Sequence, residues 1–236
     1  MRSWGPGTGA GDGATRLAPA SVRRFALVGL LSVAACGGDS PTEPAGPPAQ
    51  LEKSGGDGQD WYFSNPLPVA YGVVVRDANG RGVPGVSVTW SVTSGGGTVD
   101  PAVSVTDGDG VATATHTLGP TGASHTAAAS VAGLPPVQFT ASASSPPTSA
   151  AVTVQIQNRF SPQNVIVQVG GSVTWTWAAN QIDDHNVIFA SGPASRPPDS
   201  PTQRSGTYSA TFTGADLYRY FCSLHAGMEG TVRVVN

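Results

Sequence analysis

Residues 218–232 read YRYFCSLHAGMEGTV, and this stretch decides what the C-terminal part of the chain builds. His225 stands three residues after Cys222, and Met228 three residues after His225. Alternating runs precede the cysteine and follow the methionine, so the three side chains lie on one tight loop between two strands. A thiolate, an imidazole and a thioether form a soft donor set, which selects copper or zinc over Mg²⁺ or Ca²⁺.

A second imidazole has to come from outside this loop. The chain has four histidines, and His185 is the one other histidine of the C-terminal segment, where it opens a short apolar run. A trigonal site of two His and one Cys with a weak axial Met is the arrangement of blue-copper electron-transfer centres. We therefore expect His185, Cys222, His225 and Met228 to hold one copper ion.

Two other interpretations of these side chains stay open on the residues alone. Zn²⁺ also binds Cys and His, although it favours ligands stronger than a thioether. Alternatively, the Cys and Met are ordinary core residues of a β-rich segment. Asp183 and Asp184, beside His185, are interpreted as a solvated pair on a loop.

The segment 150–236 contains seven short runs with the alternation and bounding turn residues of β-strands. The expected strands are 152–157, 164–169, 172–177, 186–189, 207–212, 217–221 and 230–235. Seven strands suit a small Greek-key sandwich. In the third run Trp175 and Trp177 alternate with threonine, and we expect one indole in the core and the other facing outward.

This segment resembles the cupredoxins, in particular their plastocyanin-like and amicyanin-like members. The matching strings are FSP at 160–162, VQVGGSVTW at 167–175, HNV at 185–187, Phe212, and YRYFC at 218–222. The spacing Cys-x₂-His-x₂-Met resembles the short ligand loop of amicyanin-like members, whereas plastocyanin-like ones carry two more residues before the Met.

The resemblance implies a type-1 copper centre that carries single electrons. It assigns one ring nitrogen of each His, the Cys thiolate and a long axial Met sulfur to the metal. It also implies that Asn186 fixes the ligand loop and donates its backbone N–H to the sulfur of Cys222, a contact that tunes the reduction potential. Electrons would pass through the exposed edge of His225, where a redox partner protein docks.

Residues 49–143 form a separate β-rich segment, joined to the copper segment by a Ser/Pro-rich linker at 144–149. The strings VRDANGRGVPGVSVTW at 75–90, SGGGT at 94–98 and DGDGVATA at 107–114 resemble the bacterial immunoglobulin-like repeats of invasin and intimin adhesins. In that family single modules act as rigid spacers or binding platforms. His116 and His125 lack partners at ligand spacing and are interpreted as ordinary strand or loop residues.

The N-terminal residues 1–35 have the layout of a signal peptide. Arg23 and Arg24 precede the apolar run FALVGLLSVAA at 25–35, which is shorter than the roughly 20 residues that span a membrane. The run resembles the lipobox of bacterial lipoproteins, which implies lipidation of Cys36; an ordinary signal peptide is the alternative. Residues 36–48 are expected to be a disordered tether. Of the two cysteines, Cys222 is then left without a disulfide partner and free for metal.

Composition supports an all-β chain of two β-sandwiches in tandem. Of 236 residues, 31 are Gly and 20 are Pro, while charged residues make up 11% against about 25% in an average domain. The net charge of −3 excludes the basic surface that binds nucleic acid phosphates.

These features together predict a lipid-anchored membrane protein of the cell envelope, facing the periplasm or the exterior. It would carry single electrons to or from a redox partner and would not be an enzyme, because the copper segment has neither the His-x-His pairs of a multicopper oxidase nor a second Cys. Two alternatives remain: a copper-binding or delivery lipoprotein, and a surface adhesion protein with an accessory copper domain.

Leu224 leads to a testable difference from relatives that have Pro just before the second His. Leucine restores a backbone N–H, which we expect to give the sulfur of Cys222 a second hydrogen bond and to raise the reduction potential relative to a Leu224→Pro variant. Voltammetry of both proteins measures this difference. A wild-type potential equal to or below that of the variant would contradict it.

Overall fold

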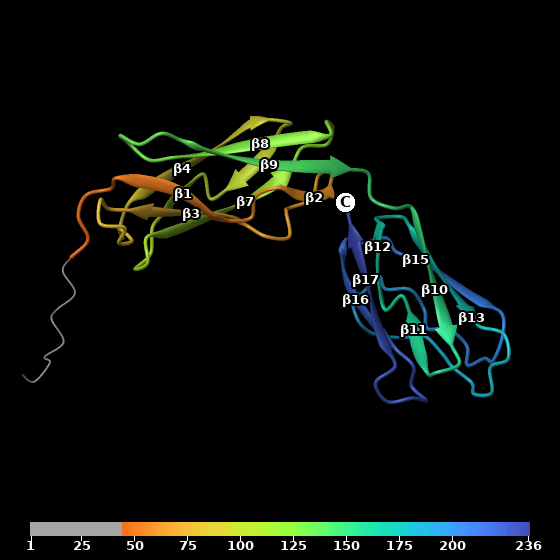
Figure 1. The fold of residues 1–236 in the computed structure, drawn as a ribbon. Coiled ribbons are helices and arrows are strands. Elements are labelled where there is room, and N and C mark those ends of the chain that lie inside the picture. Colours follow the sequence, from red (N-terminus) through yellow and green to blue (C-terminus); the bar gives the residue numbers. More distant parts are fainter. Residues whose placement is uncertain (1–43) are drawn as a thin grey trace, which may run out of the picture. The chain divides into compact units, whose positions relative to one another are not determined.

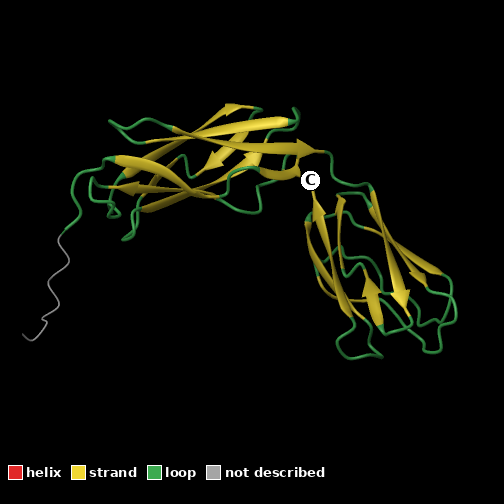
Figure 2. Cartoon of the chain, viewed as in Figure 1, coloured by secondary structure: helices red, strands yellow, loops and turns green. Residues whose placement is uncertain are grey.

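The computed structural model describes residues 44–236. Every regular element among these residues is a β-strand, which confirms the all-β expectation (Figures 1 and 2). None of the described residues lies in a helix long and apolar enough to cross a membrane. The predicted signal peptide at 1–35, the lipidation of Cys36 and the first part of the 36–48 tether lie outside the described residues, so they stay predictions. The last part of the expected tether differs from the expectation, because Ala45 packs against the first core and the backbone N–H of Gly46 donates to Oδ2 of Asp77 over 2.9 Å.

The first sandwich consists of two sheets with strand orders β1-β3-β7-β5 and β2-β9-β8-β4-β6. Its strands are β1 (Gln50–Gly55), β2 (Gln59–Tyr62), β3 (Tyr71–Arg76), β4 (Ser87–Ser94), β5 (Gly97–Asp100), β6 (Val103–Val105), β7 (Val111–Leu118), β8 (Ser124–Ser130) and β9 (Val137–Ser144). Alternate residues of these strands meet in one apolar core around Tyr71, Trp90 and Phe139.

His116 and His125 are fully buried in this first core. The Nε2 atom of His116 lies 3.3 Å from the carbonyl oxygen of Gly96, and its Nδ1 lies 3.4 Å from the hydroxyl of Tyr71. Burial lowers the pKa of His116, which keeps the ring neutral. The group of candidate metal-ligating side chains found in residues 44–236 includes neither histidine.

The second sandwich has the sheet orders β11-β10-β13-β15 and β12-β17-β16-β14. Its strands are β10 (Ser149–Gln155), β11 (Arg159–Ser161), β12 (Asn164–Gln168), β13 (Ser172–Trp177), β14 (Ile188–Ser191), β15 (Thr207–Thr211), β16 (Asp216–Phe221) and β17 (Glu229–Val235). β10 pairs with β13 and β12 with β17 in parallel, while β16 and β17 form an antiparallel hairpin. β11 had no counterpart among the seven expected strands.

The core of the second sandwich corrects one expectation. Trp175 and Trp177 are both buried, with 0% and 4% exposure, so the expectation that one of them faces outward was wrong. Residues two apart on a strand point to the same face, and here that face is the core. Thr174 and Thr176, which alternate with the indoles, face the other side of the sheet.

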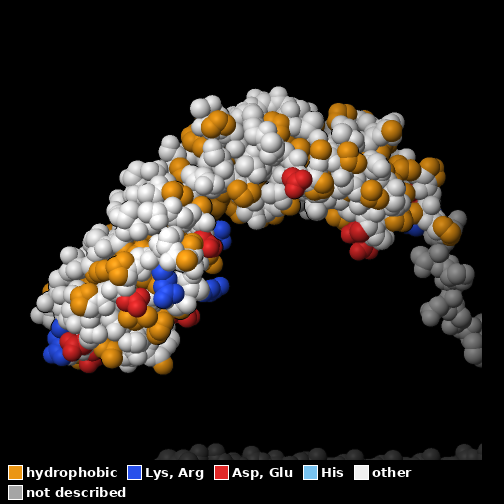
Figure 3. All heavy atoms as spheres, turned by 180° about the vertical axis from the view of Figure 1, so that it is seen from behind, with side chains coloured by type: hydrophobic (Ala, Val, Ile, Leu, Met, Phe, Trp, Pro, Cys, Tyr) orange, Lys and Arg blue, Asp and Glu red, His pale blue; other side chains and the backbone are white. Residues whose placement is uncertain are grey.

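Charged side chains are sparse on the molecule, as the composition predicts. Figure 3 shows them scattered among uncharged and apolar side chains on the face in view.

Candidate metal centre

The loop 222–228 closes the hairpin of β16 and β17 and presents three of the four predicted ligands. Phe221 pairs with Glu229 at the ends of the two strands, and the backbone N–H of Cys222 donates to the carbonyl of Met228 over 2.9 Å. Inside the loop, the N–H of His225 donates to the carbonyl of Cys222, and the N–H of Met228 to the carbonyl of His225. Gly227 has φ +77°, a left-handed conformation that favours glycine.

The structure brings His185, Cys222 and His225 together. The sulfur of Cys222 lies 3.8 Å from Nδ1 of His185 and 3.5 Å from Nδ1 of His225, and the ligand atoms of the three residues all lie within 4.8 Å of one another. Bonds from a first-row ion to nitrogen and sulfur are about 2.0–2.3 Å, so donors of one ion lie about 3–4 Å apart. These separations fit one ion between the three atoms.

Burial at the site is uneven. His185, Cys222 and Met228 are buried, while His225 is partly exposed. Burial lowers the pKa of His185, and the neighbouring His225 lowers it further, against the weaker opposite effect of Asp183 and Asp184. A lowered pKa keeps the imidazole neutral, which is the form that binds a metal.

Met228 lies at the end of the ligand loop with 1% exposure, in the same core cluster as Cys222. A thioether here would supply a weak fourth sulfur ligand to a copper ion held by Cys222 and the two histidines. Ligation through its sulfur stays a prediction.

Asn186 links the two parts of the chain that supply the site. Its Oδ1 accepts the backbone N–H of Ser223 over 2.9 Å, and its Nδ2 donates to Oγ of Ser223 over 2.9 Å and to Oγ1 of Thr202 over 3.1 Å. Asn186 directly follows His185, and Ser223 directly follows Cys222, so this side chain fixes the spacing of two candidate ligands. The predicted backbone N–H contact to the sulfur stays a prediction.

Leu224 is 52% exposed, next to the partly exposed His225. The sulfur contacts given above come from the two imidazoles, so the second hydrogen bond expected from the N–H of Leu224 stays a prediction.

Sequence reasoning missed the contribution of the segment 199–203. The backbone N–H groups of His185 and Gln203 each donate to the other's carbonyl over 2.9 Å. Thr202, from the same segment, contacts Asn186. The sequence signal for this contribution is Asp199-Ser200 between two prolines. Side chains of Asp and Ser can accept hydrogen bonds from backbone N–H groups where prolines interrupt a regular strand.

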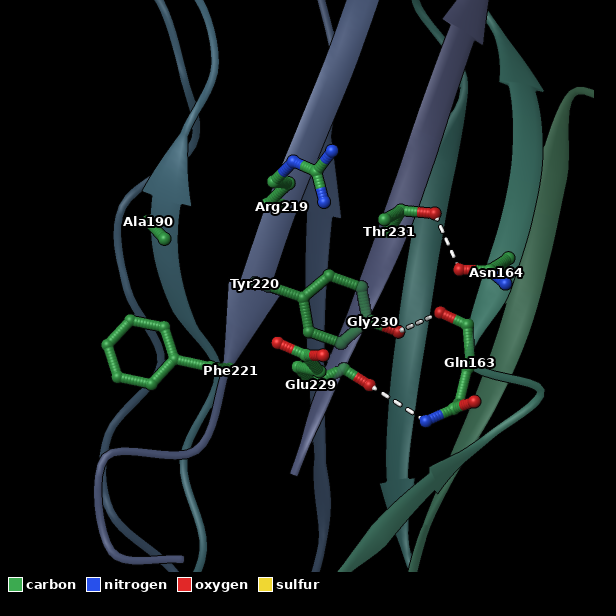
Figure 4. Close-up of a pocket in the computed structure, with 9 residues that line it drawn as sticks. All are labelled: Gln163, Asn164, Ala190, Arg219, Tyr220, Phe221, Glu229, Gly230 and Thr231. Carbon is green, nitrogen blue, oxygen red and sulfur yellow. Dashed lines mark hydrogen bonds between the residues drawn. The ribbon is translucent and has the colours of Figure 1, made fainter. Parts of the chain in front are cut away.

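A separate hollow of about 370 Å³ lies on the outer face of the sheet of β12, β17, β16 and β14 (Figure 4). Its lining residues are Gln163, Asn164, Ala190, Arg219, Tyr220, Phe221, Glu229, Gly230 and Thr231. The hydroxyl of Tyr220 donates to the carbonyl of Gln163, and that of Thr231 to Oδ1 of Asn164. None of the lining residues is a candidate ligand, so this hollow is distinct from the metal centre.

Comparisons with known proteins agree with this geometry. The model of the copper binding proteins of the plastocyanin/azurin family matches residues 149–235, and that of the bacterial Ig-like domain (group 1) matches residues 68–156. A plastocyanin from Scenedesmus fuscus is 35% identical over 85 residues, which cover 32% of this chain and 85% of that protein.

Two solved structures are also similar. A novel purple cupredoxin from Nitrosopumilus maritimus is 26% identical, with 36% of this chain and 98% of that chain covered and a TM-score of 0.32. A mutant of amicyanin, in a reduced Cu(I) form at pH 4, is 31% identical, with 36% and 81% covered and a TM-score of 0.33.

The chain belongs to the plastocyanin/azurin family of copper-binding proteins through its C-terminal domain, and an Ig-like domain precedes this copper domain. The protein is a copper-binding electron-transfer protein. The predicted cofactor, copper, and both predicted family resemblances are confirmed.

Replacement of Asn186 by Ala tests the link between the two ligand-bearing segments. The change leaves the N–H of Ser223 without its acceptor, so we expect the copper domain to lose about 1–3 kcal/mol of unfolding free energy. We also expect faster loss of copper to excess chelator. Denaturant unfolding and the decay of the copper absorption measure the two effects.

Asn164→Ala is the control, because the side chain of Asn164 accepts a hydrogen bond from the hydroxyl of Thr231 but lies on the exposed sheet face. Equal effects of the two substitutions on copper loss would show that Asn186 does not hold the site.

Proposed function

We propose that this protein is a membrane-tethered type-1 copper protein that carries single electrons to or from a redox partner, with His185, Cys222, His225 and Met228 as its ligands. One observation carries the proposal: the buried sulfur of Cys222 lies close to Nδ1 of both His185 and His225. The ring of His225 is partly exposed at the surface. Family membership supports the same chemistry.

Copper, when bound, supplies a one-electron couple between Cu(II) and Cu(I). The chain's own part is to hold the donor atoms in one arrangement for both states, because any rearrangement slows electron transfer. Cys222 belongs to the apolar core of the sandwich and His185 is fully buried, so water is kept from both donor atoms. The hydrogen bonds of Asn186 hold the ligand loop against the segment that carries His185.

His225 is the proposed point of electron entry and exit. It is partly exposed, and Leu224, Ala226 and Gly227 around it are exposed and uncharged. Uncharged neighbours let a partner protein approach the ring edge without removing water from a charge. The partner is proposed to be a redox protein that docks on this surface.

The membrane tether rests on the sequence around Cys36. In the proposal, lipid on Cys36 anchors the chain at the cell envelope, the residues that follow Cys36 link this anchor to the Ig-like domain, and the Ig-like domain acts as a spacer. The copper domain then faces the periplasm or the exterior, at a distance from the membrane where it can meet its partner.

Electron self-exchange between two copies of the protein tests the docking surface without knowledge of the partner. An Ala226→Asp substitution places a negative charge beside His225 in both copies, so we expect exchange to slow by about tenfold at low ionic strength and by less in high salt. Line broadening in NMR spectra of mixed oxidised and reduced protein gives the rate.

Val169→Asp is the control for this measurement. Val169 is 37% exposed and lies just after β12, where its backbone N–H donates to the carbonyl of Val235. Val235 is the last residue of β17, a strand about 20 Å long that begins at the ligand loop, so Val169 lies far from His225. Equal rates for the two variants would remove His225 as the contact point. Slow exchange in wild type, with ready loss of copper to a mild chelator, would favour the copper-delivery alternative.

A further inference from the structure

The segment that carries His185 runs along an open sheet edge. β14 is the last strand of the order β12-β17-β16-β14, and it pairs with β16 on one side only. On the other side, residues 185, 187 and 189 direct their backbone groups outward, because alternate residues of an extended chain face the same edge. Unpaired groups on such an edge would leave the segment free to shift.

Residues 199–203, which we call the strap, cover this edge. His185 exchanges two backbone hydrogen bonds with Gln203, and the carbonyl of Val187 accepts the N–H of Ser200 over 2.9 Å. The N–H of Val187 donates to Oγ of Ser200 over 2.8 Å. The N–H of Phe189 donates to Oδ1 of Asp199 over 2.9 Å.

Two of these acceptors are side-chain oxygens, those of Asp199 and Ser200. The strap does not form a regular strand, because Pro201 within it, and Pro197 and Pro198 directly before it, have no N–H to contribute to a ladder. The hydroxyl of Ser200 donates to the carbonyl of Pro201 over 2.9 Å, which orients its lone pairs toward Val187. The carbonyl of Pro198, directly before the strap, accepts a hydrogen bond from the hydroxyl of Tyr208 and so links this end of the segment to β15.

We propose that Asp199 and Ser200 are positioning residues for the copper centre, which hold His185 in place through the backbone of Val187 and Phe189. The inference rests on the proposed function, because it concerns the geometry of the same site. Neither residue touches the donor atoms. They act on His185 through the two residues whose N–H groups they accept.

The strap gives His185 an anchor that is separate from the ligand loop. Cys222 and His225 are held by the hairpin of β16 and β17, whereas the strap reaches His185 from the opposite edge of β14. With both anchors in place, the imidazole of His185 keeps its position when the charge of the site changes. Loss of the strap contacts would let this one ligand move.

Three variants of the full-length protein test the proposal: Asp199→Ala, Ser200→Ala and Asp199→Asn. The alanine variants each remove one acceptor, and an unmade backbone hydrogen bond of about 1 kcal/mol corresponds to about fivefold faster local opening. We therefore expect about fivefold faster amide hydrogen exchange in the copper-free protein, at Phe189 in Asp199→Ala and at Val187 in Ser200→Ala. Asp199→Asn keeps the Oδ1 acceptor and should restore the wild-type exchange rate.

Two properties of the copper-loaded variants, their EPR spectrum and their self-exchange rate, would not change if Asp199 and Ser200 only stabilised the fold. We expect a changed copper hyperfine splitting in EPR spectra and a severalfold slower self-exchange for both alanine variants, with recovery in Asp199→Asn. Asp216→Ala is the control, because Asp216 also accepts a backbone N–H, from Leu217, away from the strap.

The possible outcomes distinguish failure of the positioning role from failure of the proposed function. If wild type shows the blue-copper signature but the alanine variants match Asp216→Ala in EPR and self-exchange, the positioning role is wrong and the proposed function stands. If wild type itself lacks that signature, the proposed function fails first. A variant that does not fold is replaced by Ser200→Thr, which keeps the hydroxyl and should behave as wild type; altered spectra in that variant would also overturn the proposal.

Discussion

The close approach of one cysteine sulfur to two imidazole nitrogens is the constraint on which the rest of the copper domain depends. Three polar donor atoms within 4.8 Å of one another, with His185 and Cys222 buried, are costly to assemble unless a metal joins them. The donors come from two places in the sequence that lie 37 residues apart. The sandwich has to bring these two places together and keep them there.

Two sets of hydrogen bonds meet this requirement from different sides. Asn186 joins the residue after one ligand to the residue after the other, so the two segments cannot slide independently. The strap accepts hydrogen bonds from the backbone N–H groups of Val187 and Phe189 on the outer edge of the same segment, where no further strand pairs with it. A site held from both edges suits electron transfer, because the same arrangement of donors serves both charge states.

Much of this centre could be predicted from sequence because its signals are local. The spacing of Cys222, His225 and Met228 marks the ligand loop, and the periodicity of the runs around it places seven of the eight strands of the copper domain. The expectation that one of Trp175 and Trp177 faces outward fails because residues two apart on a strand share a face, and here that face is the core. The short strand β11 and the strap carry no periodic pattern, so hydrophobic periodicity does not predict them.

The most direct test of the central claim is the visible spectrum of the purified protein after addition of Cu²⁺, compared with that of a Cys222→Ser variant. The account predicts an intense blue thiolate-to-copper charge-transfer band in wild type and its loss in the variant, which keeps the fold but has no thiolate. A folded, copper-loaded wild-type protein without this band, or a Cys222→Ser variant that retains it, would contradict the account.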